Sequence, residues 1–171
     1  MTVSDAIHID APIEVVWAVT EDVERWPEWT PTVTSLRRAD DAPFGLGSSV
    51  RIKQPGQPES VWTVTDYVPG TGFSWKTRRL GWGMVASHHL QGEGAGTRNT
   101  LQLRASGIVA RLLWPLLRIA VRHALVQENR GLKERCEQKA SGTTTGCSPR
   151  HEIDRDLVLE VNPTSTYRSV P

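Results

Sequence analysis

His88 and Glu128 are the two side chains whose type and position best suit proton-transfer chemistry. His88 lies two residues from Leu90 in an alternating stretch, so both should project from one face of a strand. Glu128 interrupts an apolar helix stripe that contains Val121 and Leu125. A carboxylate buried there would cost several kcal/mol unless it were paired. The two residues could therefore form an acid/base pair or a polar anchor for a ligand headgroup.

The same polar residues allow other interpretations. His88 and Glu128 could form an internal hydrogen bond with no further role, or lie at a wet, open end of a cavity. His123 and Gln127, on a second side of the same helix, are a rival pair. The catalytic residues therefore stay unassigned, with His88 and Glu128 as the candidates.

The sequence contains no pattern typical of a metal or cofactor site. His88 and His89 are neighbours on a strand and should point to opposite faces. Cys136 and Cys147 lack a metal-binding spacing, and reduced cytosolic thiols are the simpler interpretation. Motifs for nucleotide binding and for serine or cysteine catalysis are absent. We therefore expect neither a metal nor an organic cofactor.

Composition narrows the function classes further. With 20 Lys and Arg against 19 Asp and Glu, the net charge of +1 argues against nucleic-acid binding. No run of about 18 apolar residues is present, so no transmembrane segment is expected. The basic start and apolar run of a signal peptide are missing too, which predicts a cytoplasmic protein. The length of 171 residues suits one domain with a real core.

A long helix from Ile108 to about Lys139 is the element around which the chain is organised. This stretch is rich in strong helix formers, and Pro115 should kink it near its start. The first half is apolar nearly all round except for a stripe of arginines. We interpret this stripe as a solvated face, and contact of the arginines with anionic lipid is the alternative. The surplus apolar surface could also support a homodimer.

Most of the chain before this helix alternates as strands do. Two short helices follow the first strand, the second being a proline-rich elbow that ends near Trp26 and Pro27. Hairpin-length turns join the remaining strands, which predicts an α+β fold with a seven-stranded antiparallel sheet. The seven segments lie around Val3–Ile9, Val33–Arg38, Val50–Lys53, Trp62–Thr65, Phe73–Arg78, Met84–Leu90 and Asn99–Ala105.

The domain is expected to occupy residues 1–139. Residues 141–146 are small and polar, as in a linker. We expect residues 140–171 to form a mostly disordered tail.

Several short motifs, in a fixed order, carry a family resemblance. They are Ile9-Asp10-Ala11-Pro12-Ile13-Glu14-Val15-Val16-Trp17, Trp26-Pro27-Glu28-Trp29, Trp62-x-Val64 followed by Phe73-x-Trp75, Gly96-Thr97-Arg98 and Gly131-Leu132-Lys133. From about Val3 to Lys139 the chain resembles the START-like or SRPBCC superfamily and its polyketide cyclase/dehydrase-like group. The resemblance implies the helix-grip fold, in which the sheet wraps around the long helix and a cavity lies between them.

The resemblance also implies binding of a small hydrophobic molecule, lipid or polyketide-like, in that cavity. One alternative is a polyketide cyclase or dehydratase in which His88 and Glu128 transfer protons. Another is a non-catalytic interaction module with a filled core. The residues expected to line the cavity, or to fill the core, are Trp62, Phe73, Trp75, His88, Leu90, Leu101, Leu103, Val121, Leu125 and Glu128.

Overall fold

The computed structural model describes residues 1–39, 41–79 and 81–144, with side chains described as far as residue 142. Seven strands and three helical segments follow one another in the predicted order. They are β1 (Thr2–Ile9), α1 (Ile13–Glu21), the 3-10 helix η1 (Val23–Glu28), β2 (Ser35–Arg38), β3 (Ser49–Lys53), β4 (Ser60–Val68), β5 (Gly72–Arg79), β6 (Trp82–Glu93), β7 (Gly96–Ser106) and α2 (Ile108–Thr144).

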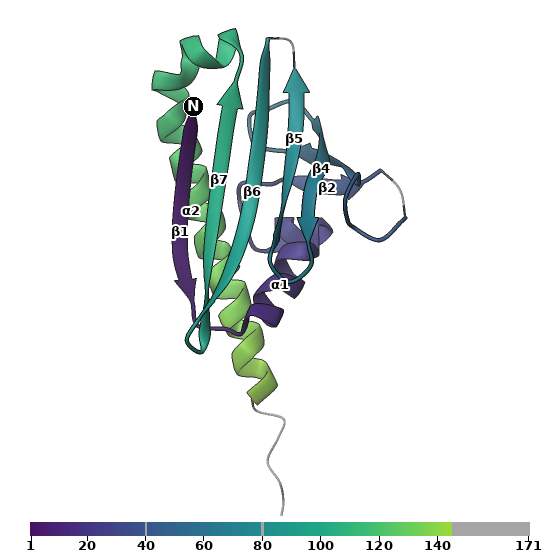
Figure 1. The fold of residues 1–171 in the computed structure, drawn as a ribbon, viewed down its shortest axis with the longest axis vertical. Coiled ribbons are helices and arrows are strands. Elements are labelled where there is room, and N and C mark those ends of the chain that lie inside the picture. Colours follow the sequence, from purple (N-terminus) through teal and green to yellow (C-terminus); the bar gives the residue numbers. More distant parts are fainter. Residues whose placement is uncertain (40, 80, 145–171) are drawn as a thin grey trace, which may run out of the picture.

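All seven strands form one antiparallel sheet in the order β1-β7-β6-β5-β4-β3-β2. Figure 1 shows α2 behind the β1 and β7 side of this sheet, and α1 at the end where β1 finishes. The predicted α+β helix-grip fold is therefore confirmed. The second strand begins at Ser35 rather than Val33, although the Thr34 N–H still donates to the Lys53 carbonyl at 2.8 Å.

Cross-strand pairs of bulky residues build the core on the concave face of the sheet. Val50 lies opposite Trp62, and Val64 lies opposite Trp75. All four are buried, and they pack with Trp26 of η1. Such pairs on one face are the unit that stabilises a sheet. The residues that alternate with period 2 in the sequence therefore do lie on a buried face of the sheet.

Helix α2 runs past its expected end at Lys139 to Thr144. Residues 140–144 are therefore helical rather than part of a tail, and residues 145–171, where the rest of the tail was expected, lie outside the described residues. Figure 1 shows the first turns of α2 crossing the end of the sheet before the helix turns to run along β1 and β7. Pro115 lies in this first part, where its missing N–H and its ring favour a bend.

The elbow formed by η1 is held tightly against α2 at Gly131. A Cβ atom on Gly131 would lie 2.0 Å from the Trp29 carbonyl oxygen, a backbone atom that cannot easily move aside. The Trp26 indole N–H donates to the Thr20 carbonyl at 3.1 Å and fixes the other side of the elbow. Only glycine therefore allows the elbow and the helix to approach so closely.

Replacing Gly131 with alanine should lower the free energy of unfolding by roughly 2 kcal/mol, because overpacking outweighs the gain in helix propensity. Gly142→Ala is the matched control, since that glycine is in the same helix and has no atom within 4 Å of a Cβ position. The control should leave stability unchanged or slightly raised. Urea unfolding followed by circular dichroism measures both, and equal stabilities of the two variants would contradict the close contact.

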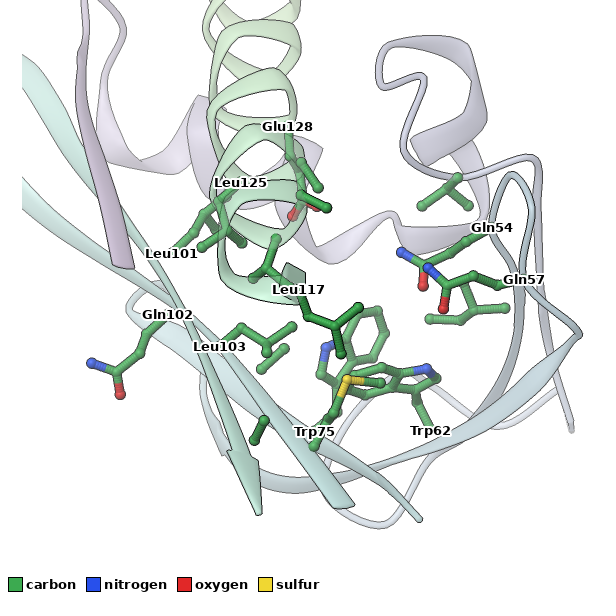
Figure 2. Close-up of a pocket in the computed structure, with 18 of the residues that line it drawn as sticks. Gln54, Gln57, Trp62, Trp75, Leu101, Gln102, Leu103, Leu117, Leu125 and Glu128 are labelled. Carbon is green, nitrogen blue, oxygen red and sulfur yellow. The ribbon is translucent and has the colours of Figure 1, made fainter. Parts of the chain in front are cut away.

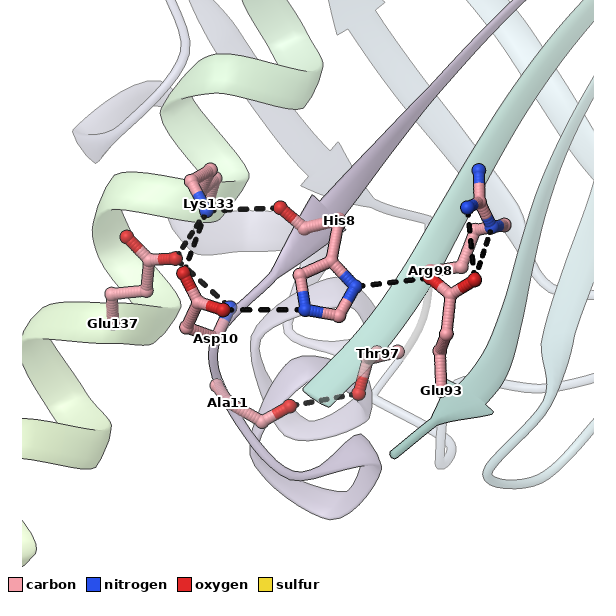
Figure 3. A network of polar contacts seen from close by, with 8 residues as sticks. All are labelled: His8, Asp10, Ala11, Glu93, Thr97, Arg98, Lys133 and Glu137. Atoms are coloured by element: carbon pink, nitrogen blue, oxygen red, sulfur yellow. Dashed lines mark hydrogen bonds and ion pairs between the residues drawn. The ribbon is translucent and has the colours of Figure 1, made fainter. Parts of the chain in front are cut away.

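The second half of α2 is tied to the sheet by a polar network, shown in Figure 3. Lys133 donates to the His8 carbonyl at 2.9 Å and forms an ion pair with Asp10 at 3.2 Å. The His8 ring then contacts Glu93, which pairs with Arg98. The hydrogen bond and charge of Lys133 hold the pKa of the Asp10 carboxyl below its usual value. These groups are partly exposed to solvent, so they set orientation more than stability.

Candidate functional site

A cavity of about 460 Å³ lies between the concave face of the sheet and α2. Figure 2 shows Leu117, Leu125 and Glu128 entering it from the helix, opposite strand residues that include Leu101 and Leu103. Trp62 and Trp75 close one side. An apolar enclosure with a few polar groups is the usual form of a small-molecule site.

Eight of the ten residues expected at this site lie on the cavity wall. They are Trp62, Trp75, His88, Leu101, Leu103, Val121, Leu125 and Glu128. Phe73 and Leu90 do not line it. Phe73 is buried behind the His88 ring, and Leu90 packs in a separate cluster with Ile9 and Leu132. Alternation identifies the face of a strand, but does not say where along the strand the core closes and the cavity begins.

The structure adds wall residues that were not predicted from the sequence. Ala110, Trp114 and Leu117 continue the helix wall ahead of Val121 at steps of four, three and four. That spacing is visible in the sequence, but the surrounding leucines obscure it. Gln54 and Gln57 reach the cavity from the turn between β3 and β4, and Figure 2 shows their amides on the side opposite Leu101 and Leu103. No sequence signal marks them.

His88 and Glu128 form a buried polar region of the cavity wall. The His88 side chain is 5% exposed and that of Glu128 is 14% exposed, with His88 Nε2 and Glu128 Oε1 3.8 Å apart. The His88 ring is stacked on Phe73, with the ring centroids 4.8 Å apart, and lies 4.9 Å from the Trp26 ring. The Thr32 hydroxyl lies 3.5 Å from Glu128 Oε2. Helix and strand thus bring together two residues 40 positions apart in the chain.

Burial disfavours the charged form of both groups. It lowers the pKa of His88 to about 3 and raises the pKa of Glu128 to about 7. At neutral pH His88 is therefore an uncharged imidazole, and Glu128 takes up and releases a proton near physiological pH. The separation of 3.8 Å is too long for a hydrogen bond, so each group keeps capacity for a third partner in the cavity.

His123 and Gln127, the alternative polar pair, do not line this cavity. His123 is exposed and lines an open hollow between α2 and the start of β1, at Thr2, Val3 and Ser4. Gln127 is not part of the cavity wall. Proton transfer within the cavity would therefore rely on His88 and Glu128.

The described residues contain no cluster of three or more His, Cys, Asp or Glu side chains that could hold a metal ion. Cys136 is buried, and burial raises the pKa of its thiol to about 12, which suits a packing role. Cys147 lies outside the described residues. Across the same residues, no helix has both the length and the apolar composition needed to cross a membrane.

The geometry agrees with a comparison of the sequence with known families. Residues 1–137 match the model of a family described as polyketide cyclase / dehydrase and lipid transport. The chain belongs to this family. The resemblance to the SRPBCC polyketide cyclase-like group is thereby confirmed, and membership supports hydrophobic ligand binding in general terms. No curated protein sequence matches the chain significantly.

Several solved structures share the fold. The ZhuI aromatase/cyclase from Streptomyces sp. R1128 superposes with a TM-score of 0.66 at 18% identity, covering 81% of this chain and 94% of that one. A protein from Thermus thermophilus superposes with a TM-score of 0.66 at 21% identity, covering 82% of this chain and 99% of that one. The di-domain aromatase/cyclase StfQ of the steffimycin biosynthetic pathway superposes with a TM-score of 0.65 at 14% identity, covering 82% of this chain and 51% of that one. The chain therefore spans about half of the di-domain protein, and identities this low establish the fold alone.

Proposed function

We propose that this protein binds a small hydrophobic ligand, lipid or polyketide-like, between the sheet and α2. The observation that carries the proposal is the cavity of about 460 Å³, whose walls include the indoles of Trp62 and Trp75 and the side chains of Leu101, Leu103 and Leu117. Such walls favour transfer of an apolar molecule from water. The same cavity argues against the alternative of an interaction module with a filled core.

The polar region at His88 and Glu128 specifies one further property of the ligand. His88 is uncharged at neutral pH, and Glu128 exchanges its proton near pH 7. A ligand hydroxyl or carbonyl placed between them could hydrogen-bond to both without bringing a charge into the cavity. A ligand with an apolar body and one uncharged polar group beside His88 and Glu128 fits best.

The uncharged fluorophore N-phenyl-1-naphthylamine tests this proposal. It should bind saturably with a dissociation constant in the micromolar range, corresponding to about 8 kcal/mol. Five tryptophans, at positions 26, 62, 75, 82 and 114, line the cavity and should change their fluorescence when it enters. Native mass spectrometry of protein purified from its own host should show a retained small molecule. Absence of saturable probe binding would contradict the proposal.

A second candidate function is cyclisation or dehydration of a polyketide-like substrate. It is favoured by one observation, the buried carboxyl of Glu128 3.8 Å from the His88 ring in the cavity wall, where burial raises the pKa of Glu128 to about 7. General acid–base catalysis is most efficient when the pKa of the catalytic group lies near the working pH. Glu128→Gln should then abolish turnover, whereas a carrier with the same substitution should retain an uncharged ligand.

A further inference from the structure

The first half of α2 presents an apolar face that nothing in the described chain covers. Ile108, Leu112, Leu116 and Ile119 are 73%, 75%, 77% and 70% exposed, respectively. They recur at steps of four, four and three, so they form one continuous stripe, named here the outer face of α2. Contiguous exposed apolar surface of this kind marks an interaction site, unlike single exposed residues.

The surroundings of the outer face are positively charged. Arg111, Arg118 and Arg122 are exposed on the same half of the helix, and residues 108–127 include no Asp or Glu. None of the three arginines has an ion-pair partner among the described residues. In the second half of α2, by contrast, Lys133 pairs with Asp10 and Arg135 pairs with Glu28. As far as the described residues go, the charge of the first half is therefore available to a partner of opposite sign.

Arginine and apolar groups also meet in one concave surface beside this face. Arg118, Arg122, Trp114 and Ile119 line the open hollow between α2 and the first residues of β1. An anionic phospholipid has the two matching parts, a phosphate for the arginines and acyl chains for the apolar groups. A second copy of this chain matches poorly, because a symmetric contact would bring two sets of arginines together without acidic partners.

We propose that the outer face of α2 docks on an anionic phospholipid bilayer, with its arginines at the headgroups. The helix lies in the interface rather than crossing it, as amphipathic helices with basic flanks do. Ala110, Trp114 and Leu117 of the same helical segment line the ligand cavity. The docked surface and the cavity wall are thus two sides of one element, although docking does not depend on what the cavity binds.

Flotation of the full-length chain with phosphatidylcholine vesicles, with and without phosphatidylglycerol, tests the proposal. Binding should be at least about 10-fold tighter to the vesicles that contain phosphatidylglycerol and should fall as salt is raised. The double variant Leu112→Gln/Leu116→Gln should weaken it by on the order of 10-fold or more, because it removes the apolar contact. Arg118→Glu/Arg122→Glu should abolish the preference for phosphatidylglycerol.

Two control variants make the same chemical changes elsewhere. Leu46→Gln alters a leucine that is 72% exposed outside α2, and Arg37→Glu alters an exposed arginine on β2. Both should bind vesicles like the wild type, and all variants should keep the wild-type circular dichroism because the altered side chains are exposed. Equal binding to both kinds of vesicle, or wild-type binding by the double leucine variant, would overturn the proposal. A third result would also overturn it. The wild-type protein would sediment as a dimer, the double leucine variant would sediment as a monomer, and neither would bind vesicles.

Discussion

Replacing Ala86 with tryptophan should abolish binding of N-phenyl-1-naphthylamine while the protein stays folded. Ala86 lies on the cavity wall, paired with Trp75 on one side and Leu103 on the other. An indole at this position would occupy the space that the probe needs. We expect affinity to fall by at least about 100-fold, which corresponds to nearly 3 kcal/mol.

The neighbouring substitution Val85→Trp is the matched control. Val85 is on the same strand, but its side chain is exposed on the opposite face of the sheet, so the same indole should leave probe binding unchanged. Leu117→Trp fills the cavity from the helix side and should reproduce the effect of Ala86→Trp. Titrations by probe fluorescence, with circular dichroism to check folding, measure all three. Wild-type affinity in a folded Ala86→Trp protein would place the binding site elsewhere.

Replacing Glu128 with glutamine should change how stability depends on pH. Burial raises the pKa of Glu128 from an ordinary value of 4.5 to about 7, so the folded state holds this proton more tightly than the unfolded state does. The folded state is then favoured below pH 4.5, and this contribution is lost as the pH rises towards 7. The loss should amount to about 3 kcal/mol. Glutamine does not titrate, so the variant should not show this loss.

His88 has the opposite effect on stability. Its pKa is lowered from 6.5 to about 3, so the stability it contributes is present above pH 6.5 and is lost as the pH falls towards 3. The two effects partly cancel between about pH 4.5 and pH 6.5 in the wild-type protein. Only the difference between the wild type and Glu128→Gln isolates the carboxyl group.

Urea unfolding of both proteins at a series of pH values measures that difference. Between about pH 4 and pH 8 this difference in the free energy of unfolding should shift by about 3 kcal/mol in favour of Glu128→Gln. The probe should bind both proteins with similar affinity, because it is uncharged. A difference that stays constant over this range would show that Glu128 has an ordinary pKa in the folded protein.

Much of the architecture could be predicted from local pattern. Alternation at Trp62 and Val64 on one strand, and at Phe73 and Trp75 on the next, identified the buried face of the sheet, and hairpin-length turns required neighbouring strands to be antiparallel. These features depend on residues close together in sequence, so short-range periodicity reveals them. The same logic placed His88 on the buried face and Glu128 on the inward side of the helix.

The limits of the cavity depended on tertiary structure. Phe73 and Leu90 have the same periodicity as their neighbours, yet the elbow at Trp26 and the cluster around Ile9 fill the space beside them. Gln54 and Gln57 enter the cavity because a turn folds over it, and their own sequence carries no sign of this. Cavity shape depends on how distant elements pack, which periodicity does not encode.

The sequence by itself determined the order of the elements, their faces and the polar residues that point inward, because each follows from spacing along one strand or helix. Tertiary structure decided which of those residues meet. It set the 3.8 Å between His88 and Glu128, and with it the burial that moves their pKa values in opposite directions. It also left Leu112 and Leu116 uncovered while packing the other side of α2 over the cavity. The physical reason is that burial is a property of the space between elements, which exists only once the sheet has closed around the helix.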